Sequence, residues 1–574
     1  MTSQPQTNPV PPPLNDHRPT VTWEQFEQHQ ILGLIRSLPE PRPYSHDELL
    51  ANRRQVAVFK AQISQYRRSL QRPIQQSQNT ALGGALCKLK VLLWRMFPFN
   101  DLSVDIVINI FRYAVWSSAN SESHLLRFRL TWVCRRWRHI AVHDQTLWNT
   151  IWFKDVKLGY QRSKLYFERA GTATLDLRIE DDDTSRLIPG QPMSGDDMTH
   201  VLDILITKSN QIRMLIVVVE LWPPILVLLD RLHRSSRSLQ QLEHIEIHRT
   251  GRPYRWDGPG YPLSNYQHVL SLCNGRTQRI NYICLNGIHL NWDRSCLANL
   301  TNLDLRRMPP ELGPSLERFR YMLEGSPNLE KLTLDGAGPI APMSSAAHSY
   351  PPVFLPRLES LVLGDFLVTY AVFCAGIIHA PNVRDVTLLN LGGQDHSQLF
   401  KLLTGKFPEL LMLTLYFVNI RKSAENTRIM VQWLLSIPKI KFMRVAGMKT
   451  DLFDHLVVDG RLHIRNDIPL MPTADVREAI MANWSPIILC PELEGVEIQQ
   501  ININSAVKFV SDRKNLGVPL LKLYIHQNTL ETMSAEEAAM LKRQNYEQNF
   551  VNAMPPTSKT PMEESIWKQV REGR

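Results

Sequence analysis

Few residues in the sequence have the types and spacing that metal chemistry needs. His244 and His248 lie four residues apart in a segment whose apolar residues alternate as in a strand, which puts both imidazoles on one face. A structural zinc site needs about four ligands, and no third ligand lies near this pair. The acidic run at residues 180–183 could bind a cation weakly, but such runs are typical of solvated loops. The sequence therefore predicts no metal site.

Sequence motifs of catalysis and nucleotide binding are also absent. The chain has no G-x-x-x-x-G-K-[ST] phosphate loop, no G-x-S-x-G elbow, no H-E-x-x-H and no dinucleotide fingerprint. Gly83 and Gly84 precede Lys88, but without the spacing of a phosphate loop. We therefore expect a non-catalytic protein that needs no cofactor.

The cysteines and the apolar runs indicate an intracellular protein. The seven cysteines are scattered, lie mostly among apolar residues and form no C-x-x-C pair, which is typical of reduced core thiols. The N-terminal residues show neither a signal core nor a transit pattern. The most apolar run, residues 214–232, is interrupted by Glu220, Asp230 and two prolines, so we assign it to a protein core and expect no membrane span. We expect a cytoplasmic or nuclear location.

The positive charge is concentrated before residue 97. The 574 residues carry a net charge of +10, and residues 41–96 alone contain ten basic and two acidic side chains. Residues 127–138 (RFRLTWVCRRWR) resemble a DNA-recognition helix in composition. Val133 and Trp137, however, fall on an apolar face, so we favour protein docking over groove binding for this stretch.

Residues 97–153 form the segment around which the chain is organised, and we call them the helical module. Apolar residues recur there at helical spacing in segments of residues 102–111, 125–141 and 147–148, separated by polar breaks. They exceed what short helices can bury among themselves. A surplus of this kind usually marks a docking surface.

The helical module resembles an F-box. Residues 102–111 (LSVDIVINIF) are similar to the opening of that motif, and residues 133–141 (VCRRWRHIA) with Leu147 and Trp148 are similar to its close. Two departures accompany the match. Ser103 stands where the family usually has proline, and residues 112–132 make a longer spacer, in which we interpret residues 117–123 as an inserted loop.

The resemblance implies a receptor subunit that docks on a Skp-type adaptor and, through it, on a cullin ubiquitin ligase. Such a receptor has no active site; it raises the effective concentration of target lysines near a charged conjugating enzyme. We assign Ile140 and Trp148 to the core. The predicted adaptor contacts are Leu102, Val104, Ile106, Val107, Ile110, Leu130, Val133 and Trp137.

After the helical module the sequence repeats. Units of the form L-x-x-L-x-L begin at Leu300, Leu329 and Leu358, and weaker ones begin at Val383, Leu410, Ile440 and Leu493. The fourth residues of successive units are 29, 29, 25, 27, 30 and 53 residues apart, so we expect one degenerate unit in the last gap. Looser units begin at Leu242 and Ile280, and residues 174–179 and 212–219 are expected to open the array.

These units resemble leucine-rich repeats, which implies an α/β solenoid following the three-helix module. The regular Asn or Cys after each strand is mostly absent, so we expect irregular curvature. Side chains between the leucines should line one strand face that binds a protein target, although they could also be ordinary solvated residues. The predicted target contacts are Asp304, Lys331, Thr333, Glu359, Arg384, Thr387, Thr414 and Arg444, with Glu497 on the same face.

The remaining segments frame these two parts. We expect a disordered tail over residues 1–45, a basic amphipathic helix over 46–75 and a linker over 76–96. The apolar seam of that helix should pack on the helical module or the repeats, with pairing to a second copy as the alternative. The repeats should span 154–531, and 532–574 should hold a helix over 532–551 and a disordered end. This layout is similar to F-box-like proteins of mushroom-forming fungi.

The sequence thus predicts a substrate receptor of a ubiquitin ligase that acts on an unknown protein target. One alternative is a leucine-rich-repeat scaffold outside any ligase, because Ser103 and the long spacer could weaken adaptor binding. The other is a nucleic-acid binder that uses residues 41–96, for which steep salt dependence of binding to a random duplex would be the sign.

Overall fold

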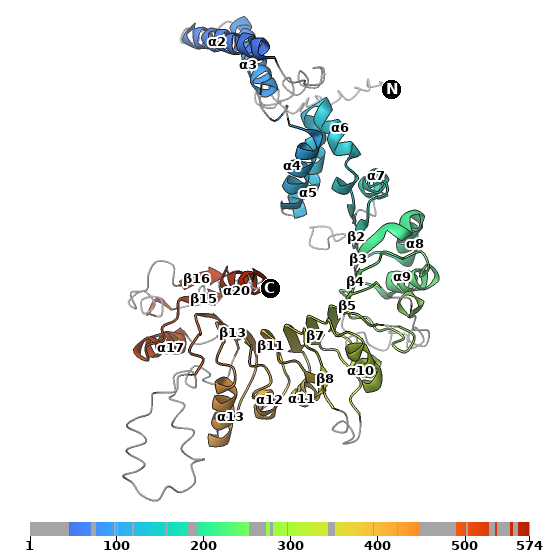
Figure 1. Cartoon of the computed structure of the whole chain (residues 1–574), viewed down its shortest axis with the longest axis vertical. Helices are drawn as coiled ribbons and strands as arrows, with labels where there is room; N and C mark the ends of the chain where they lie inside the picture. The colour runs from blue at the N-terminus through green and yellow to red at the C-terminus, as the bar shows by residue number, and fades with distance from the viewer. Residues whose placement is uncertain are drawn as a thin grey trace, which may run out of the picture. The chain divides into compact units, whose positions relative to one another are not determined.

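The structure is a computed structural model of the 574-residue chain, and it divides into two units (Figure 1). One unit comprises residues 1–150 with 165–173, and the other comprises 151–164 with 174–574. The structure describes residues 45–69, 76–96, 99, 102–117, 120–154, 159–181, 192–251, 271–275, 279–295, 297–342, 351–393, 395–421, 423–447, 489–500, 503–526, 534–536, 551–554 and 561–572. Residues 1–44 of the tail predicted over 1–45 and most of the helix predicted over 532–551 lie outside these residues. The degenerate repeat expected between residues 443 and 496 adds no strand to the sheet there, because Met443 pairs directly with Val496; that prediction was wrong.

Two helices precede the helical module. Helix α2 (His46–Ser69) lies within the amphipathic helix predicted over 46–75. Its seam packs on α3 (Gln76–Arg95), whereas we expected the helical module or the repeats as its partner. The core of this hairpin contains Ile63, Ala85 and Leu89. The prediction of a linker over 76–96 was therefore wrong. From residue 81 onward, leucines and alanines recur at helical spacing and are buried against α2. This packing stabilises the helix more than the glycine pair and the Gln/Asn-rich start destabilise it.

The helical module contains α4 (Val104–Ser117), α5 (Asn120–Val133), α6 (Arg135–His143) and the short η2 (Gln145–Leu147). Most of the predicted inserted loop is helical, since α5 begins at Asn120. The apolar segment 125–141 is two helices, separated at Cys134, whose Sγ accepts the Trp137 N–H at 3.4 Å as the cap of α6. Its buried apolar residues include Val107, Phe111, Val115, Leu130, Ile140, Ala141, Leu147 and Trp148.

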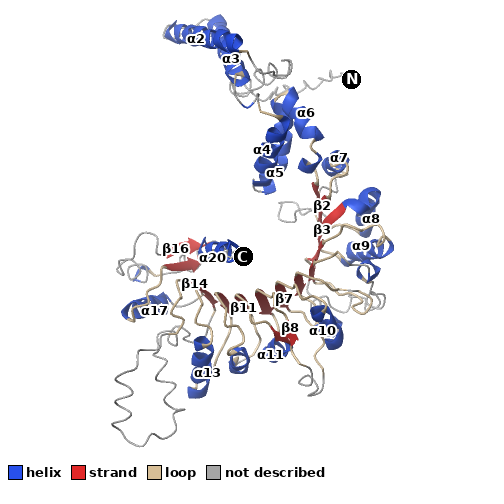
Figure 2. Ribbon diagram, viewed as in Figure 1, coloured by secondary structure: helices blue, strands red, loops and turns tan. Residues whose placement is uncertain are grey.

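The second unit is built on one large sheet. In the described part of the chain, fourteen strands follow one another in chain order, and each neighbouring pair from β2 to β16 is parallel (Figure 2). A separate pair is formed by β8 (Val353–Phe354) and β10 (Ile378–His379). The strands of the large sheet are β1 (Thr150–Phe153), β2 (Leu175–Glu180), β3 (Ile212–Val219), β4 (His244–Arg249), β5 (Tyr282–Asn286), β6 (Asn302–Arg306), β7 (Lys331–Asp335), β9 (Ser360–Gly364), β11 (Asp385–Leu389), β12 (Met412–Tyr416), β13 (Phe442–Ala446), β14 (Gly495–Gln499), β15 (Lys522–His526) and β16 (Val551–Met554).

The register of the strands agrees with the spacing of the predicted repeat units. The fourth residue of every unit pairs with the fourth residue of the next, from Ile245 on β4 through Leu303 on β6 and Leu413 on β12 to Val496 on β14. These residues are buried, and they stack into a continuous apolar column because strand side chains alternate between the two faces. The result is a mixed α/β fold that is consistent with the predicted solenoid.

Helices cover one face of the sheet. Most of those drawn in Figure 2 lie on the side of the buried columns, and the other side of the sheet, which we call the open face, carries only α20 (Pro561–Glu572) among the described helices. The predicted disordered end is therefore wrong for residues 561–572. The helices on the covered side are α8 (Gly195–Leu205), α9 (Trp222–Arg234), α10 (Leu316–Glu324), α11 (Val368–Ile377), α12 (Ser397–Leu403), α13 (Ala424–Leu435) and α17 (Ile503–Asn515).

A backbone ladder replaces the missing asparagine ladder. The residue after each strand of the large sheet from β5 to β14 has a positive φ between 49° and 70°, and it is glycine at three of the eight positions, including Gly447. At seven of these positions, from Gly287 to Gly447, the N–H donates to the carbonyl of the last residue of the next strand in the sheet, as from Asp365 to Leu389 O at 2.9 Å and from Phe417 to Ala446 O at 3.0 Å. Neighbouring turns are therefore joined by regular backbone hydrogen bonds. We expected irregular curvature because the asparagine side chains are absent, but the backbone supplies a ladder in their place.

None of the helices among the described residues combines the length and the apolar character needed to cross a bilayer.

Candidate functional site

An exposed apolar stripe runs along α4. Ile106, Ile110 and Tyr113 are spaced by four and three residues, so they share one side of the helix. Their exposed fractions are 47%, 39% and 77%, and Val104 in the first turn is 49% exposed. The opposite side of α4 carries Val107, Phe111 and Val115 into the core. This helix is thus apolar on both sides, which distinguishes it from an ordinary surface helix.

The predicted adaptor contacts divide by burial. Val104, Ile106 and Ile110 are exposed, and Leu102, Val133 and Trp137 are half-buried. Val107 and Leu130 are buried inside the module, with exposed fractions of 0% and 6%. Their assignment to the docking face was wrong, because the packing of the helices uses them for the core.

Three aromatic residues of the module were missed. Tyr113 and Trp116 extend the exposed side of α4. On α5, Trp132 is half-exposed, and so is Leu125, which lies about two helical turns before it. All lie in the spacer 112–132, which the comparison with the F-box pattern treated as an insertion. Extending the helical spacing of Ile106 and Ile110 by three residues would have found Tyr113.

Polar contacts fix α4 against the following helices. Arg112 donates two hydrogen bonds to Asp144, from Nε to Oδ2 at 3.0 Å and from Nη2 to Oδ1 at 2.9 Å. This side-chain contact raises the pKa of Arg112. Arg136 donates to the carbonyl of Leu102 at 2.5 Å, and Trp148 Nε1 donates to Ala141 O at 2.7 Å. The exposed stripe is therefore held on a rigid support.

Trp137 is part of that support. Its ring lies 4.8 Å from the ring of Phe99 and 4.9 Å from that of Phe111, measured between centroids. The aromatic cluster joins the chain before α4, the core side of α4 and the first turn of α6. Trp137 can therefore position the N-terminal end of the stripe as well as contact a partner.

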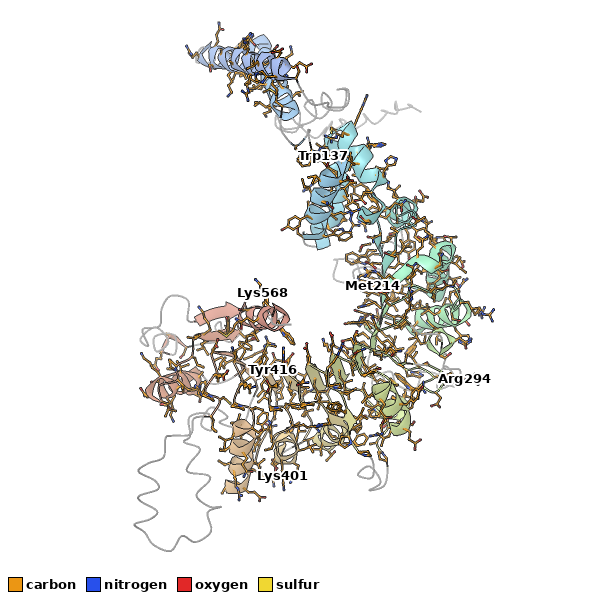
Figure 3. All side chains as sticks on the ribbon, viewed as in Figure 1. Trp137, Met214, Arg294, Lys401, Tyr416 and Lys568 are labelled. Carbon is orange, nitrogen blue, oxygen red and sulfur yellow. The ribbon has the colours of Figure 1, made fainter. Side chains whose placement is uncertain are left out.

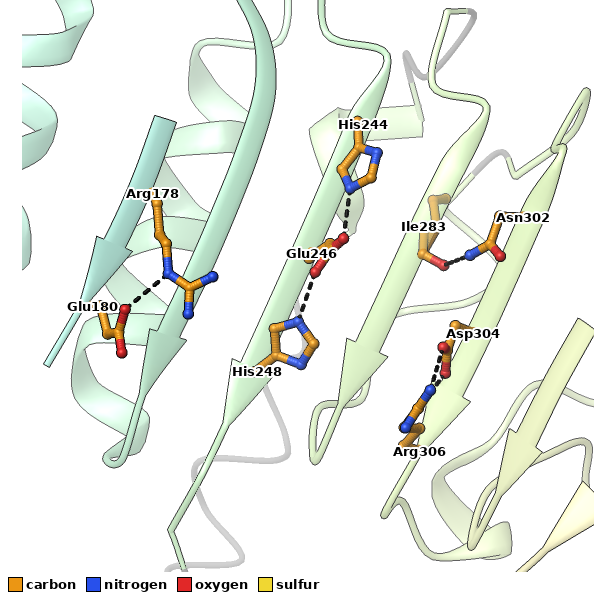
Figure 4. A network of polar contacts seen from close by, with 9 residues as sticks. All are labelled: Arg178, Glu180, His244, Glu246, His248, Ile283, Asn302, Asp304 and Arg306. Carbon is orange, nitrogen blue, oxygen red and sulfur yellow. Dashed lines mark hydrogen bonds and ion pairs between the residues drawn. The ribbon is translucent and has the colours of Figure 1, made fainter. Parts of the chain in front are cut away.

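The open face of the sheet carries neighbouring charges of opposite sign (Figure 4). Arg178 pairs with Glu180 at 2.8 Å on β2, and Arg306 pairs with Asp304 on β6 through two hydrogen bonds of 2.7 and 2.8 Å. Farther along the sheet, Arg444 on β13 pairs with Glu497 on β14 at 2.8 Å. Each of these charges is paired with an opposite charge on the same or the neighbouring strand, so the charged groups are held in fixed positions on the open face.

Between β2 and β6 the open face has a carboxylate shared by two imidazoles. Glu246 on β4 contacts His244 Nε2 at 2.6 Å through Oε1 and His248 Nε2 at 3.0 Å through Oε2. The imidazole of His244 stacks on Tyr282 with 3.8 Å between ring centroids. These contacts lower the pKa of Glu246 from its ordinary value of 4.5 to about 2.

The Glu246 cluster fits polar recognition better than metal binding. Both Nε2 atoms are directed at the carboxylate, which leaves no convergent set of ligands. Across the described part of the chain, no group of three or more His, Cys, Asp or Glu residues is arranged to hold a metal ion. The sequence had singled out the two histidines but not their shared carboxylate.

The predicted target contacts are also divided by burial. Lys331, Thr387 and Arg444 lie on the open face and are half-buried, while Glu359 and Arg384 are half-buried residues that immediately precede β9 and β11. Asp304, Thr333, Thr414 and Glu497 are buried, so their expected exposure was wrong. Strands about 4.8 Å apart let the side chains of both neighbouring strands cover a short residue between them.

The comparisons with known proteins add no assignment: no protein-family model matches the chain, and no similar sequence was found among curated proteins.

Proposed function

We propose that the chain is an F-box-like substrate receptor, which docks on a Skp-type adaptor of a cullin ubiquitin ligase and binds a protein target with its repeats. The observation that carries the proposal is the exposed stripe of Ile106, Ile110 and Tyr113 on α4. It lies within the segment whose sequence resembles an F-box opening.

The stripe has the character of a protein-docking surface. Large apolar side chains that protrude side by side from one helix remain in contact with water unless a partner covers them, and covering them contributes about 25 cal/mol per Å² of apolar area. The Arg112 to Asp144 contact and the Trp137 cluster hold α4 in place, so little order is lost on binding. A preformed apolar helix face suits a permanent adaptor.

The open face has a different character, suited to an exchangeable target. It presents paired charges such as Arg444 with Glu497 and the Glu246 cluster, together with half-buried Lys331 and Thr387. Such alternating charges select partners by complementarity more than they add affinity. A receptor built in this way performs no bond chemistry; it brings target lysines near the ubiquitin-charged enzyme.

Capture of the adaptor tests the proposal. The tagged wild-type chain should recover a Skp-type adaptor, and Ile106→Asp with Ile110→Asp should abolish recovery, because both charges would be buried in the interface. Val58→Asp, which changes an exposed apolar residue of α2, is the matched control and should leave recovery unchanged. Equal adaptor recovery by the wild type and the double variant would overturn the assignment.

A second candidate function rests on the hairpin of α2 and α3. Arg53, Arg54, Lys60 and Lys88 are exposed there, and they could contact phosphates. Binding of the chain to a random DNA duplex at low salt, lost steeply as salt increases, would favour nucleic-acid binding. Absence of binding at low salt would remove that candidate.

A further inference from the structure

Helix α20 lies on the open face, across strands β12 to β15 (Figure 1). Its Ile566 is buried in a cluster with Met412 on β12, Phe442 on β13 and Tyr524 on β15. Met562, Trp567 and Leu411 pack around this cluster. We call Met412, Phe442, Gly495 and Tyr524 the helix patch. The open face also carries apolar side chains elsewhere, such as Met214 and Ile216 on β3, so what defines the patch is the helix that covers it.

The helix itself is amphipathic. Met562 and Ile566 are four residues apart and both face the patch, followed directly by Trp567. Glu564, Ser565, Lys568 and Gln569 are exposed on the other sides. The contact is thus made by one apolar stripe of a helix on an apolar surface, which is the helix-in-groove mode of peptide recognition.

Gly495 indicates that the patch is shaped for a helix. It is the first residue of β14, and because it is not among the residues with positive φ, its backbone conformation does not itself require glycine. Its register neighbour on β13 is the large Phe442. A Cβ at position 495 would overlap the Met562 sulfur and lie 3.0 Å from Phe442 Cδ2. The missing side chain therefore leaves the space that Met562 fills.

The aromatic walls of this space are mutually supported. Phe442 and Tyr524 meet edge to face with 6.0 Å between ring centroids, on either side of β14. The guanidinium of Arg444 lies 6.0 Å from the Phe442 ring centroid, and its charge is paired with Glu497. The surface that α20 covers is thus apolar, with supported aromatic rings and an ion pair beside it.

We infer that the helix patch is a binding site for an amphipathic helix, occupied within the chain by α20, and that the target displaces α20 by presenting a similar stripe. The target part of this inference rests on the proposed receptor function; the occupancy by α20 does not. The partner class is a protein helix with a flexible aliphatic or thioether side chain at one position and a bulky apolar one four residues later. Binding of such a target would expose α20.

A peptide with the sequence of residues 559–574 tests the site in trans. Its binding is measured by fluorescence anisotropy to full-length chains that differ only at the patch contacts. Ile566→Asp in the chain should release α20 and let the peptide bind, whereas the wild type should bind it at least about tenfold more weakly, because α20 competes at an effective concentration on the order of millimolar. Adding Gly495→Val to the Ile566→Asp chain should abolish binding.

Two results would overturn the inference. One is no binding of the peptide to the Ile566→Asp chain at about 1 mM, since stable occupancy in cis requires a trans affinity better than the effective concentration. The other is equal peptide affinity for the Ile566→Asp chain with and without Gly495→Val. A control peptide with Asp in place of Ile566 should not bind any of the chains.

Hydrogen exchange provides a test that needs no peptide. Gly495→Val should remove the amide protection of residues 561–572. The control is Thr387→Val, which also places a valine on the open face but on β11, and it should keep that protection. Valine suits a strand, so the sheet itself should remain protected. Protection of α20 retained in Gly495→Val would contradict the inference.

The two proposals fail separately. Gly495→Val leaves the α4 stripe unchanged, so adaptor recovery should equal that of the wild type. A chain that binds the peptide as expected but recovers no adaptor would keep the helix site and remove the receptor function. A chain that recovers the adaptor but fails the peptide test would do the reverse.

Discussion

At Glu246 a single carboxylate holds two imidazoles on the open face. The contacts with His244 and His248 keep it ionised to much lower pH than an exposed glutamate, with a pKa of about 2. Asp304, in contrast, is buried and held by both arms of Arg306. Both carboxylates help to fix the side chains around them, so a target would meet a surface whose charges are already oriented.

Glu246 should make stability depend on acid pH. Between about 4.5 and about 2 the unfolded chain binds a proton that the folded carboxylate does not, so the stability contributed by Glu246 is lost as the pH falls through this range. Denaturant unfolding of the wild type and Glu246→Gln should show a stability difference that shrinks as the pH falls from 5 toward 2. A difference that does not change with pH would contradict the ion-pair description.

Gly447 should be sensitive to a single methyl group. It has a φ of +57°, and a Cβ there would overlap the Phe417 ring, whereas Gly405 has a φ of +73° with no atom within 4 Å of its Cβ position. Gly405→Ala should cost about 1 kcal/mol from backbone strain alone. Gly447→Ala should cost at least about 1 kcal/mol more, measured by denaturant unfolding. Equal costs would mean that Phe417 moves away freely.

At the scale of elements, the sequence predicted strands better than helices. Each L-x-x-L-x-L unit carries its own register, because residues alternate between a buried column and the open face, and β6, β7 and β9 lie where the pattern places them. Helix α3 was missed because its partner α2, and not its own composition, stabilises it. Helix α20 was missed for the same reason: its stripe is short and gains its stability from the helix patch.

The docking surface could be predicted only in part. The F-box resemblance located α4 and its exposed Ile106 and Ile110, but it could not separate core from surface at Val107 and Leu130. That separation depends on how α4, α5 and α6 pack, which a linear motif does not encode. The alternation of side chains along each strand correctly predicted which residues point to the open face, but it did not predict how exposed they are. The burial of Asp304 and Thr333 depends on the side chains of neighbouring strands.

The contact between Arg112 and Asp144 should stabilise the helical module. Arg112→Leu leaves the nearly buried Asp144 carboxylate with only the backbone N–H and hydroxyl of Thr146. Because the Arg112 side chain is 40% exposed and screened by water, we expect a cost of about 1 kcal/mol in thermal or denaturant unfolding. Arg129→Leu, a change at an exposed position of α5, is the control. An unchanged stability in Arg112→Leu would show that the pair contributes nothing.

At the scale of the whole molecule, the two units carry surfaces of opposite character. The first has an apolar stripe on α4, which suits a constant partner, and the second has an open face with ion pairs and the helix patch, which suits a regulated one. The backbone ladder after the strands lets the sheet extend repeat by repeat, so each repeat depends mainly on its neighbours. This division of surfaces is what a receptor that joins a ligase to its target needs.

Titration of a purified Skp-type adaptor against the purified chain is the most direct test of the receptor hypothesis. The wild type should bind with a Kd in the micromolar range or tighter, and Ile106→Asp with Ile110→Asp should weaken binding by about a hundredfold or more, since each change costs roughly 2 kcal/mol at a buried contact. Val58→Asp should bind like the wild type. No binding by the wild type, or equal binding by the double variant, would contradict it.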